Sequence, residues 1–219
     1  MNKQEVRSRI EEVGIVPAIR VSTTEDALFA AEAIAGGGIP ILEVTLTVPE
    51  AVKVISQVVQ KAPEVIVGAG SVSDIEAARR CLDVGAQFLT TDGLDRDTVE
   101  FAVQQNVVVF PGTLTPTDVL AAWKLGPDFI KIVPCGHVGG DSYIRSLKAM
   151  FPKVPMIAAG GVNQRTAFDF IRAGAVALGI GGELIPRESI RRRQPDRIAE
   201  LARRFLLSVS TAREQFPDR

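Results

Sequence analysis

The chain has 219 residues, of which 46% are hydrophobic and 23% charged, and its formal net charge is −1. This length and composition are typical of a globular protein with one sizeable core, and a length above 200 residues favours a barrel or another large α/β fold. A net charge near zero provides no overall field that would favour nucleic acid or an anionic membrane as a partner.

The N-terminal segment, the lengths of the apolar runs and the cysteines indicate the cellular compartment of the protein. Residues 1–12 are charged and predict an amphipathic helix rather than a signal peptide, and no apolar run reaches the roughly 18 residues of a membrane-spanning helix. The two cysteines, Cys81 and Cys135, lack the spacing of a metal site and indicate free thiols in a reducing compartment. We therefore expect a cytoplasmic protein with no cofactor and no nucleic-acid or membrane partner.

Eight short runs rich in β-branched residues follow one another along the chain: residues 15–20, 39–46, 64–70, 86–91, 106–112, 128–134, 154–161 and 175–182. Segments with a 3.6-residue apolar period lie between them. A repeat of roughly 20 to 25 residues fits one strand, one helix and two loops, joined by right-handed crossovers. The pattern predicts an α/β fold, a single (β/α)8 TIM barrel domain over residues 1–219 with a short N-terminal helix.

The predicted helices have recognisable boundaries. Residues suited to cap a helix N-terminus precede several of them: Thr24, Ser73, Asp95, Thr117 and Asn163. Glycines close four of them before the next strand: Gly38, Gly85, Gly126 and Gly174. No linker or change in composition predicts a second domain.

Three polar side chains stand near the ends of predicted strands, each on a face that alternates with an apolar one: Arg20, Glu43 and Lys131. Central strands of an open parallel sheet would read as nearly continuous apolar runs. Polar residues at these positions suit the inside of the C-terminal end of a barrel, where barrel enzymes build their active sites. We therefore expect these side chains to project into one common opening.

Lys131 and Glu43 are the candidate catalytic residues. In an apolar or cationic pocket the pKa of a lysine falls, and a neutral amine can attack a ketone to form a Schiff base. A glutamate in the same pocket can move protons during carbinolamine formation and C–C cleavage. The alternative is a Lys131–Glu43 ion pair that only closes the barrel. Arg20 is expected either to bind an anionic substrate group or to form a scaffold salt bridge.

Two glycine pairs follow the last two predicted strands, Gly160-Gly161 and Gly181-Gly182. In barrels of this kind the corresponding loops often present backbone N–H groups and the N-terminus of a short helix to a phosphate, although such pairs also form ordinary tight turns. His137 is the only histidine, which argues against a histidine-based metal site or a Ser-His-Asp triad.

Six motifs occur in the order and spacing of one family: LEVTL (42–46), VGAGS (67–71), FPGTLTPTD (110–118), KIVP (131–134), AAGGV (158–162) and GIGGELI (179–185). From about residue 8 to residue 212 the chain resembles the 2-keto-3-deoxy-6-phosphogluconate (KDPG) and 4-hydroxy-2-oxoglutarate (KHG) aldolases, which are class I pyruvate aldolases. The resemblance implies a homotrimeric, metal-independent barrel that cleaves a keto acid to pyruvate and an aldehyde.

By this resemblance Lys131 forms the Schiff base, Glu43 is the general acid/base and Ser71 contacts the pyruvyl carboxylate. The strand positions and the resemblance together give the expected substrate-binding residues: Arg20, Thr45, Gly70, Ser71, Pro111, Thr115, Gly160, Gly161, Gly181 and Gly182.

The chain departs from the family pattern at four positions: Thr47 in place of a common arginine, Asp92 in a T-D-G that replaces S-P-G, Val133 in place of an aromatic residue, and Glu183 in place of a frequent serine. We expect weakened binding of a distal phosphate and a relaxed specificity. Two other functions stay open, namely a degenerate family member that binds a keto acid without turnover, and a phosphate-binding barrel isomerase or synthase.

Overall fold

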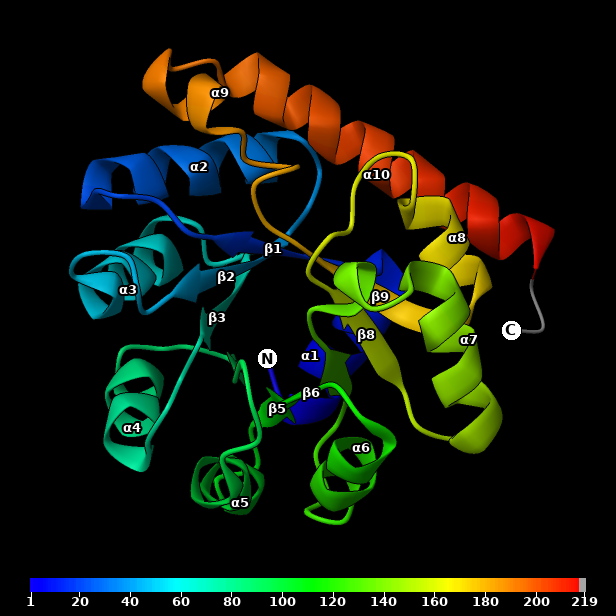
Figure 1. The fold of residues 1–219 in the computed structure, drawn as a ribbon. Coiled ribbons are helices and arrows are strands. Elements are labelled where there is room, and N and C mark those ends of the chain that lie inside the picture. Colours follow the sequence, from blue (N-terminus) through cyan, green and yellow to red (C-terminus); the bar gives the residue numbers. More distant parts are fainter. Residues whose placement is uncertain (217–219) are drawn as a thin grey trace.

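The computed structural model describes residues 1–216 and is drawn in Figure 1. Within these residues the strands form one sheet in the order β5-β4-β3-β2-β1-β9-β8-β7-β6, and every neighbouring pair is parallel. The strands are β1 (Ile15–Ile19), β2 (Ile41–Thr45), β3 (Ile66–Gly70), β4 (Phe88–Thr90), β5 (Val108–Phe110), β6 (Gly112–Thr113), β7 (Ile130–Ile132), β8 (Met156–Ala159) and β9 (Ala175–Ile180).

The two end strands of this order, β5 and β6, are consecutive pieces of chain separated by Pro111. The prediction was a single strand at residues 106–112, which contains β5 and the first residue of β6. Proline has no backbone N–H and interrupts the ladder, yet the Pro111 carbonyl still accepts from the Lys131 N–H at 3.0 Å. Because β5 pairs with β4 while β6 pairs with β7, the sheet becomes a nearly closed parallel barrel of the TIM type. The predicted fold is thus confirmed.

Helices surround this barrel in a ring made of α2 to α8 and α10 (Figure 1). The helices are α1 (Lys3–Val13), α2 (Thr24–Gly36), α3 (Ala51–Lys61), α4 (Ile75–Asp83), α5 (Arg96–Gln104), α6 (Pro116–Trp123), α7 (Gly140–Met150), α8 (Ala167–Arg172), α9 (Arg187–Arg191) and α10 (Pro195–Gln215), with a 3-10 turn η1 (Cys135–His137). Among the described residues, none of the helices is both long and apolar enough to span a membrane.

The predicted helix starts are displaced by one to three residues in four cases. The residues preceding the helices are Thr23, Asp74, Thr115 and Thr166, where Thr24, Ser73, Thr117 and Asn163 were predicted. An N-cap side chain must accept from an N–H two or three residues later, as Thr23 does from Asp26. The four predicted closing glycines all have positive φ, a region that favours glycine, and Asp95 precedes α5 as predicted.

An aromatic layer fills the lower part of the barrel. Phe88 stacks on Phe110 with ring centroids 5.1 Å apart, and Phe110 meets Phe129 edge-on at 5.9 Å. Gly68 makes room for this layer, since a Cβ there would lie 2.2 Å from the Phe88 ring. Helix α1 closes the N-terminal end below, where the Arg7 guanidinium lies 5.8 Å from the Phe129 ring centroid. Above the aromatic layer lies the mouth, which is the C-terminal end of the barrel.

Candidate active site

Lys131 and Glu43 lie in the layer directly above the aromatic rings. Side chains two residues apart on a strand share a face, so Lys131 follows Phe129 and Thr90 follows Phe88 on the inside. Lys131 is 6% and Glu43 5% exposed. Gly70 provides the space for the glutamate, because a Cβ there would come within 1.6 Å of the Glu43 Oε1. The two predicted catalytic side chains are therefore both buried in the mouth, and the position of Glu43 requires the missing side chain of Gly70.

The direct ionic partner of Lys131 is Asp92. The Lys131 Nζ lies 2.9 Å from the Asp92 Oδ1 and 3.4 Å from the Thr90 Oγ1. The lysine side chain is 7% exposed and that of Asp92 50%, so the pair joins the buried layer to the surface of the mouth. A Lys131–Glu43 ion pair, the scaffold alternative considered from the sequence, is not the contact that Lys131 makes.

Glu43 lies in surroundings that favour its neutral form. Burial raises the pKa of Glu43, and the nearby Asp92 carboxylate acts in the same direction. Lys131, a hydrogen bond with Thr90 and Arg20 lower it but do not cancel the effect of burial. A raised pKa keeps a larger share of the carboxyl group protonated at a given pH, which suits a group that must first give and later accept a proton.

Asp92 has the opposite character and lies on a chain of polar contacts. Burial opposes its charge, but Lys131, a hydrogen bond from Ser71 and Arg20 together lower the pKa of Asp92. The Ser71 hydroxyl donates to the Asp92 Oδ2 at 2.6 Å, and the Arg20 Nη2 lies 3.2 Å from the Ser71 Oγ and 3.5 Å from the same carboxylate oxygen. Asp92 is therefore an ionised carboxylate that accepts hydrogen bonds from Lys131 and Ser71 and is ion-paired with Arg20.

Three other residues predicted to bind substrate have structural contacts. The Thr45 hydroxyl donates to the Ile19 carbonyl at 3.0 Å, which ties β2 to β1. Thr115 caps α6, accepting from the Asp118 N–H at 3.3 Å. Pro111 separates β5 from β6. Nothing in these contacts assigns the three residues to a ligand.

The glycine pairs form two different loops. Gly160 and Gly161 have φ of 76° and 87°, and a Cβ on either would come within 2.8 to 2.9 Å of the backbone at Pro134 or Gly136. This pair thus allows close packing against the turn that follows Lys131. The Gly181 carbonyl accepts from two N–H groups of the turn before α9.

The predicted short helix after β9 does not begin at the glycine pair. Gly182 and Glu183 are exposed, and α9, with five residues, begins only at Arg187. Glu183 therefore lies in the turn before the helix rather than at its N-terminus.

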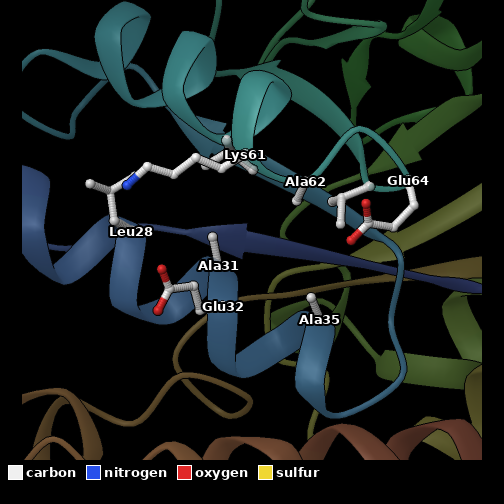
Figure 2. A pocket seen from close by; sticks show the side chains of 9 residues that line it. Leu28, Ala31, Glu32, Ala35, Lys61, Ala62 and Glu64 are labelled. Carbon is white, nitrogen blue, oxygen red and sulfur yellow. The ribbon is translucent and has the colours of Figure 1, made fainter.

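Two cavities bear on where a ligand would bind. One, of about 360 Å³, is lined by residues of the loops after β3 and β4, including Ser71, Asp92 and Gly93, and lies beside the network of Asp92. The other, of about 230 Å³, lies between α2 and α3 with Lys61 and Glu64 at its edge (Figure 2). Only the first has residues of the mouth in its lining. In residues 1–216, no group of three or more His, Cys, Asp or Glu side chains is arranged to hold a metal ion.

Comparisons with known proteins agree with this geometry. The family model of the KDPG and KHG aldolases matches residues 6–201. The KHG/KDPG aldolase of Escherichia coli (strain K12) is 31% identical over 190 residues, covering 86% of this chain and 89% of that protein. The 2-dehydro-3-deoxy-phosphogluconate aldolase of Dickeya dadantii is 29% identical over 189 residues, with 86% and 89% covered.

A solved structure extends the similarity to the fold. The KDPG aldolase of Legionella pneumophila, with pyruvate captured at low pH as a covalent carbinolamine intermediate, superposes with a TM-score of 0.84. It is 26% identical in sequence, and the match covers 90% of this chain and 96% of that one.

Proposed function

Because this chain belongs to the KDPG and KHG aldolase family, we propose that it is a class I aldolase acting through a Schiff base on Lys131. Its substrates are 4-hydroxy-2-keto acids such as KDPG or KHG, and its products are pyruvate and an aldehyde. The observation that carries this proposal is the buried Lys131 amine in the mouth, together with a glutamate whose pKa is raised.

Schiff-base formation uses Lys131 as the nucleophile. Lys131, which pairs with the ionised Asp92, first releases a proton to solvent. Its neutral amine then attacks the C2 carbonyl carbon of the keto acid and gives a carbinolamine, which loses water to give a protonated imine. Protonation of the departing hydroxyl needs an acid within the mouth. Glu43 suits this step, since burial favours its protonated form.

Cleavage then needs a base for the C4 hydroxyl of the substrate. When Glu43 has given up its proton, it can accept the hydroxyl proton while the C3–C4 bond breaks. The electron pair of that bond moves toward the imine, so the aldehyde leaves and an enamine remains on Lys131. The enamine takes a proton at C3, and addition of water to the imine releases pyruvate and restores the lysine. The protonated imine thus acts as the electron sink.

The resemblance further implies a homotrimer, and Ser71 as a partner of the pyruvyl carboxylate. Arg20, which its strand position places in the mouth, is proposed to bind an anionic substrate group as well. Burial raises the pKa of Cys81 to about 11 and that of Cys135 to about 12, so both thiols are expected to stay protonated and inert. These free, buried thiols favour a reducing compartment such as the cytoplasm. We further propose that residues 1–219 form one aldolase-type barrel domain.

Pyruvate release from a panel of phosphorylated and unphosphorylated 4-hydroxy-2-keto acids tests the proposal. An aldolase cleaves at least one of them and loses that activity in Lys131→Met. A binding protein without turnover would be labelled at Lys131 by pyruvate and borohydride but would cleave nothing. A barrel isomerase or synthase would show neither labelling nor cleavage.

A further inference from the structure

Three donors of the mouth already bind a carboxylate, that of Asp92. We propose that Asp92 is a specificity-determining residue whose carboxylate occupies, in the free enzyme, the subsite for the carboxylate of the keto acid, so that substrate binds by displacing it. This inference rests on the proposed function and names the group that the substrate must compete with. It is carried by the contacts of Asp92 with Lys131, Ser71 and Arg20.

The position of Asp92 matches what Schiff-base chemistry requires. In a keto acid the carboxylate is attached to the carbon that the lysine attacks. Covalent bond lengths then place a carboxylate oxygen about 2.7 to 3.6 Å from the lysine nitrogen once the bond has formed. The Asp92 Oδ1 lies 2.9 Å from the Lys131 Nζ, which is this distance range. An Asp92 oxygen thus lies at the distance that a substrate oxygen must reach.

The surroundings leave few other places for that substrate carboxylate. Glu43 lies on one side of Lys131, and its carboxyl group has no positive charge that could attract a substrate carboxylate. On the other side the Ser71 hydroxyl and the Arg20 guanidinium supply the uncharged and the charged donor that carboxylates commonly accept from. Both donors point at Asp92. A keto acid that uses them takes over the Ser71 hydrogen bond and the Arg20 ion pair of Asp92.

Two ionised carboxylates do not share one such subsite, because like charges a few ångströms apart repel. Asp92 must therefore turn away or take up a proton when the substrate binds. It has room to turn, since its side chain is half exposed and a Cβ added to Gly93, which follows it, would meet nothing within 4 Å. The neighbouring cavity of about 360 Å³ can receive the displaced side chain.

A matched pair of ketones separates this role from simple positioning of Lys131. Pyruvate carries the carboxylate, whereas hydroxyacetone is an uncharged ketone that forms the same kind of Schiff base. The measurement is the ketone concentration that gives half-maximal borohydride trapping, in the wild type, in Asp92→Asn and in Asp92→Ser. Asp97→Asn, which removes an exposed charge in the first turn of α5, serves as the control.

We expect both Asp92 variants to lower the half-maximal pyruvate concentration by about tenfold or more, the effect of removing one competing charge. The value for hydroxyacetone changes by less than about threefold, and Asp97→Asn behaves as the wild type. A parallel shift for both ketones, or weaker trapping of pyruvate, would overturn the proposal and make Asp92 a positioning residue for Lys131.

A second experiment tests the same proposal without a covalent reaction. Acetate cannot form a Schiff base, so its binding, followed by titration of amide NMR signals, reports the subsite alone. Asp92→Asn should bind acetate about tenfold more tightly than the wild type, and equal affinities would contradict displacement. If the wild type cannot be trapped by any ketone, the aldolase proposal fails, while the acetate result still decides whether Asp92 occupies an anion subsite.

Discussion

The floor of the mouth and its rim are built in different ways. On the floor, strands hold Lys131 and Glu43 in a buried layer, where each charge has defined neighbours. At the rim, the loops after β8 and β9 present glycine backbone, and the charged side chains there, Arg165 and Glu183, are exposed. Buried residues on the floor can have shifted pKa values and can therefore take part in catalysis, whereas exposed residues at the rim affect only the preference between substrates.

Removing the floor's nucleophile should have the largest effect. Lys131→Met keeps an unbranched side chain of similar length on β7 but cannot form a Schiff base, so the rate of aldol cleavage should fall by roughly 10⁴-fold or more. A coupled assay of pyruvate release measures it. Lys124→Met is the matched control, since Lys124 is exposed at the end of α6. Retention of cleavage by Lys131→Met would place the chemistry elsewhere.

Removing the acid/base of the floor should have the next largest effect. Glu43→Gln preserves the shape that Gly70 accommodates but cannot transfer a proton. Its kcat should fall by about 10² to 10⁴, the usual contribution of a positioned acid/base. Steady-state kinetics decide the point. A near wild-type kcat with a changed KM would instead make Glu43 a binding residue.

The stability of Glu43→Gln relative to the wild type should increase as pH rises. The folded-state pKa of Glu43 is raised above its ordinary value of 4.5, mainly by burial. The stability associated with its protonated form is therefore complete below that ordinary value and is lost as pH rises through the raised pKa. Glutamine does not titrate, so the Tm of Glu43→Gln minus that of the wild type should increase from acidic to neutral pH.

Melting curves over that pH range would test the sign. Asp92 cannot produce the same trend, because its pKa is lowered and its contribution is lost only as pH falls. A Tm difference that is constant with pH, or that shrinks as pH rises, would show that the negative charge of Glu43 does not destabilise the folded protein.

The smallest effect is expected at the rim. Glu183→Ser removes a negative charge near the predicted phosphate loop, so kcat/KM for KDPG should rise by about threefold to tenfold, less than the contribution of a buried charge because Glu183 is exposed. The kcat/KM for KHG should stay nearly constant, and the wild-type preference for KDPG should be below about 10²-fold. Equal improvement for both substrates would show that Glu183 does not act on the phosphate.

Several of these features could be predicted from sequence because they depend on local periodicity. Alternation along the strands placed Glu43 and Lys131 on the inside, and the recurring strand and helix segments predicted the barrel. The break of one strand at Pro111 follows from the missing proline N–H, although the pattern alone predicted an uninterrupted strand. Helix starts were displaced because neighbouring residues such as Thr23 and Thr24 are both able to cap, and only the backbone geometry chooses between them.

The role of Asp92 could not be predicted in this way. Its partner Lys131 is 39 residues further along the chain, and the contact depends on how the loop after β4 places its side chain across the mouth. The sequence marked Asp92 only as a departure from a family pattern. Similarly, the hydroxyl of Thr45 faces the Ile19 carbonyl, a contact between strands that no motif shows.

The central claim is that Lys131 forms the covalent bond with the substrate. Incubation with pyruvate, reduction with borohydride and peptide mapping by mass spectrometry test it directly. The account predicts one stable pyruvyl adduct, located on Lys131 and abolished in Lys131→Met. An adduct on another lysine such as Lys124 or Lys148, or no adduct under conditions where cleavage proceeds, would contradict it.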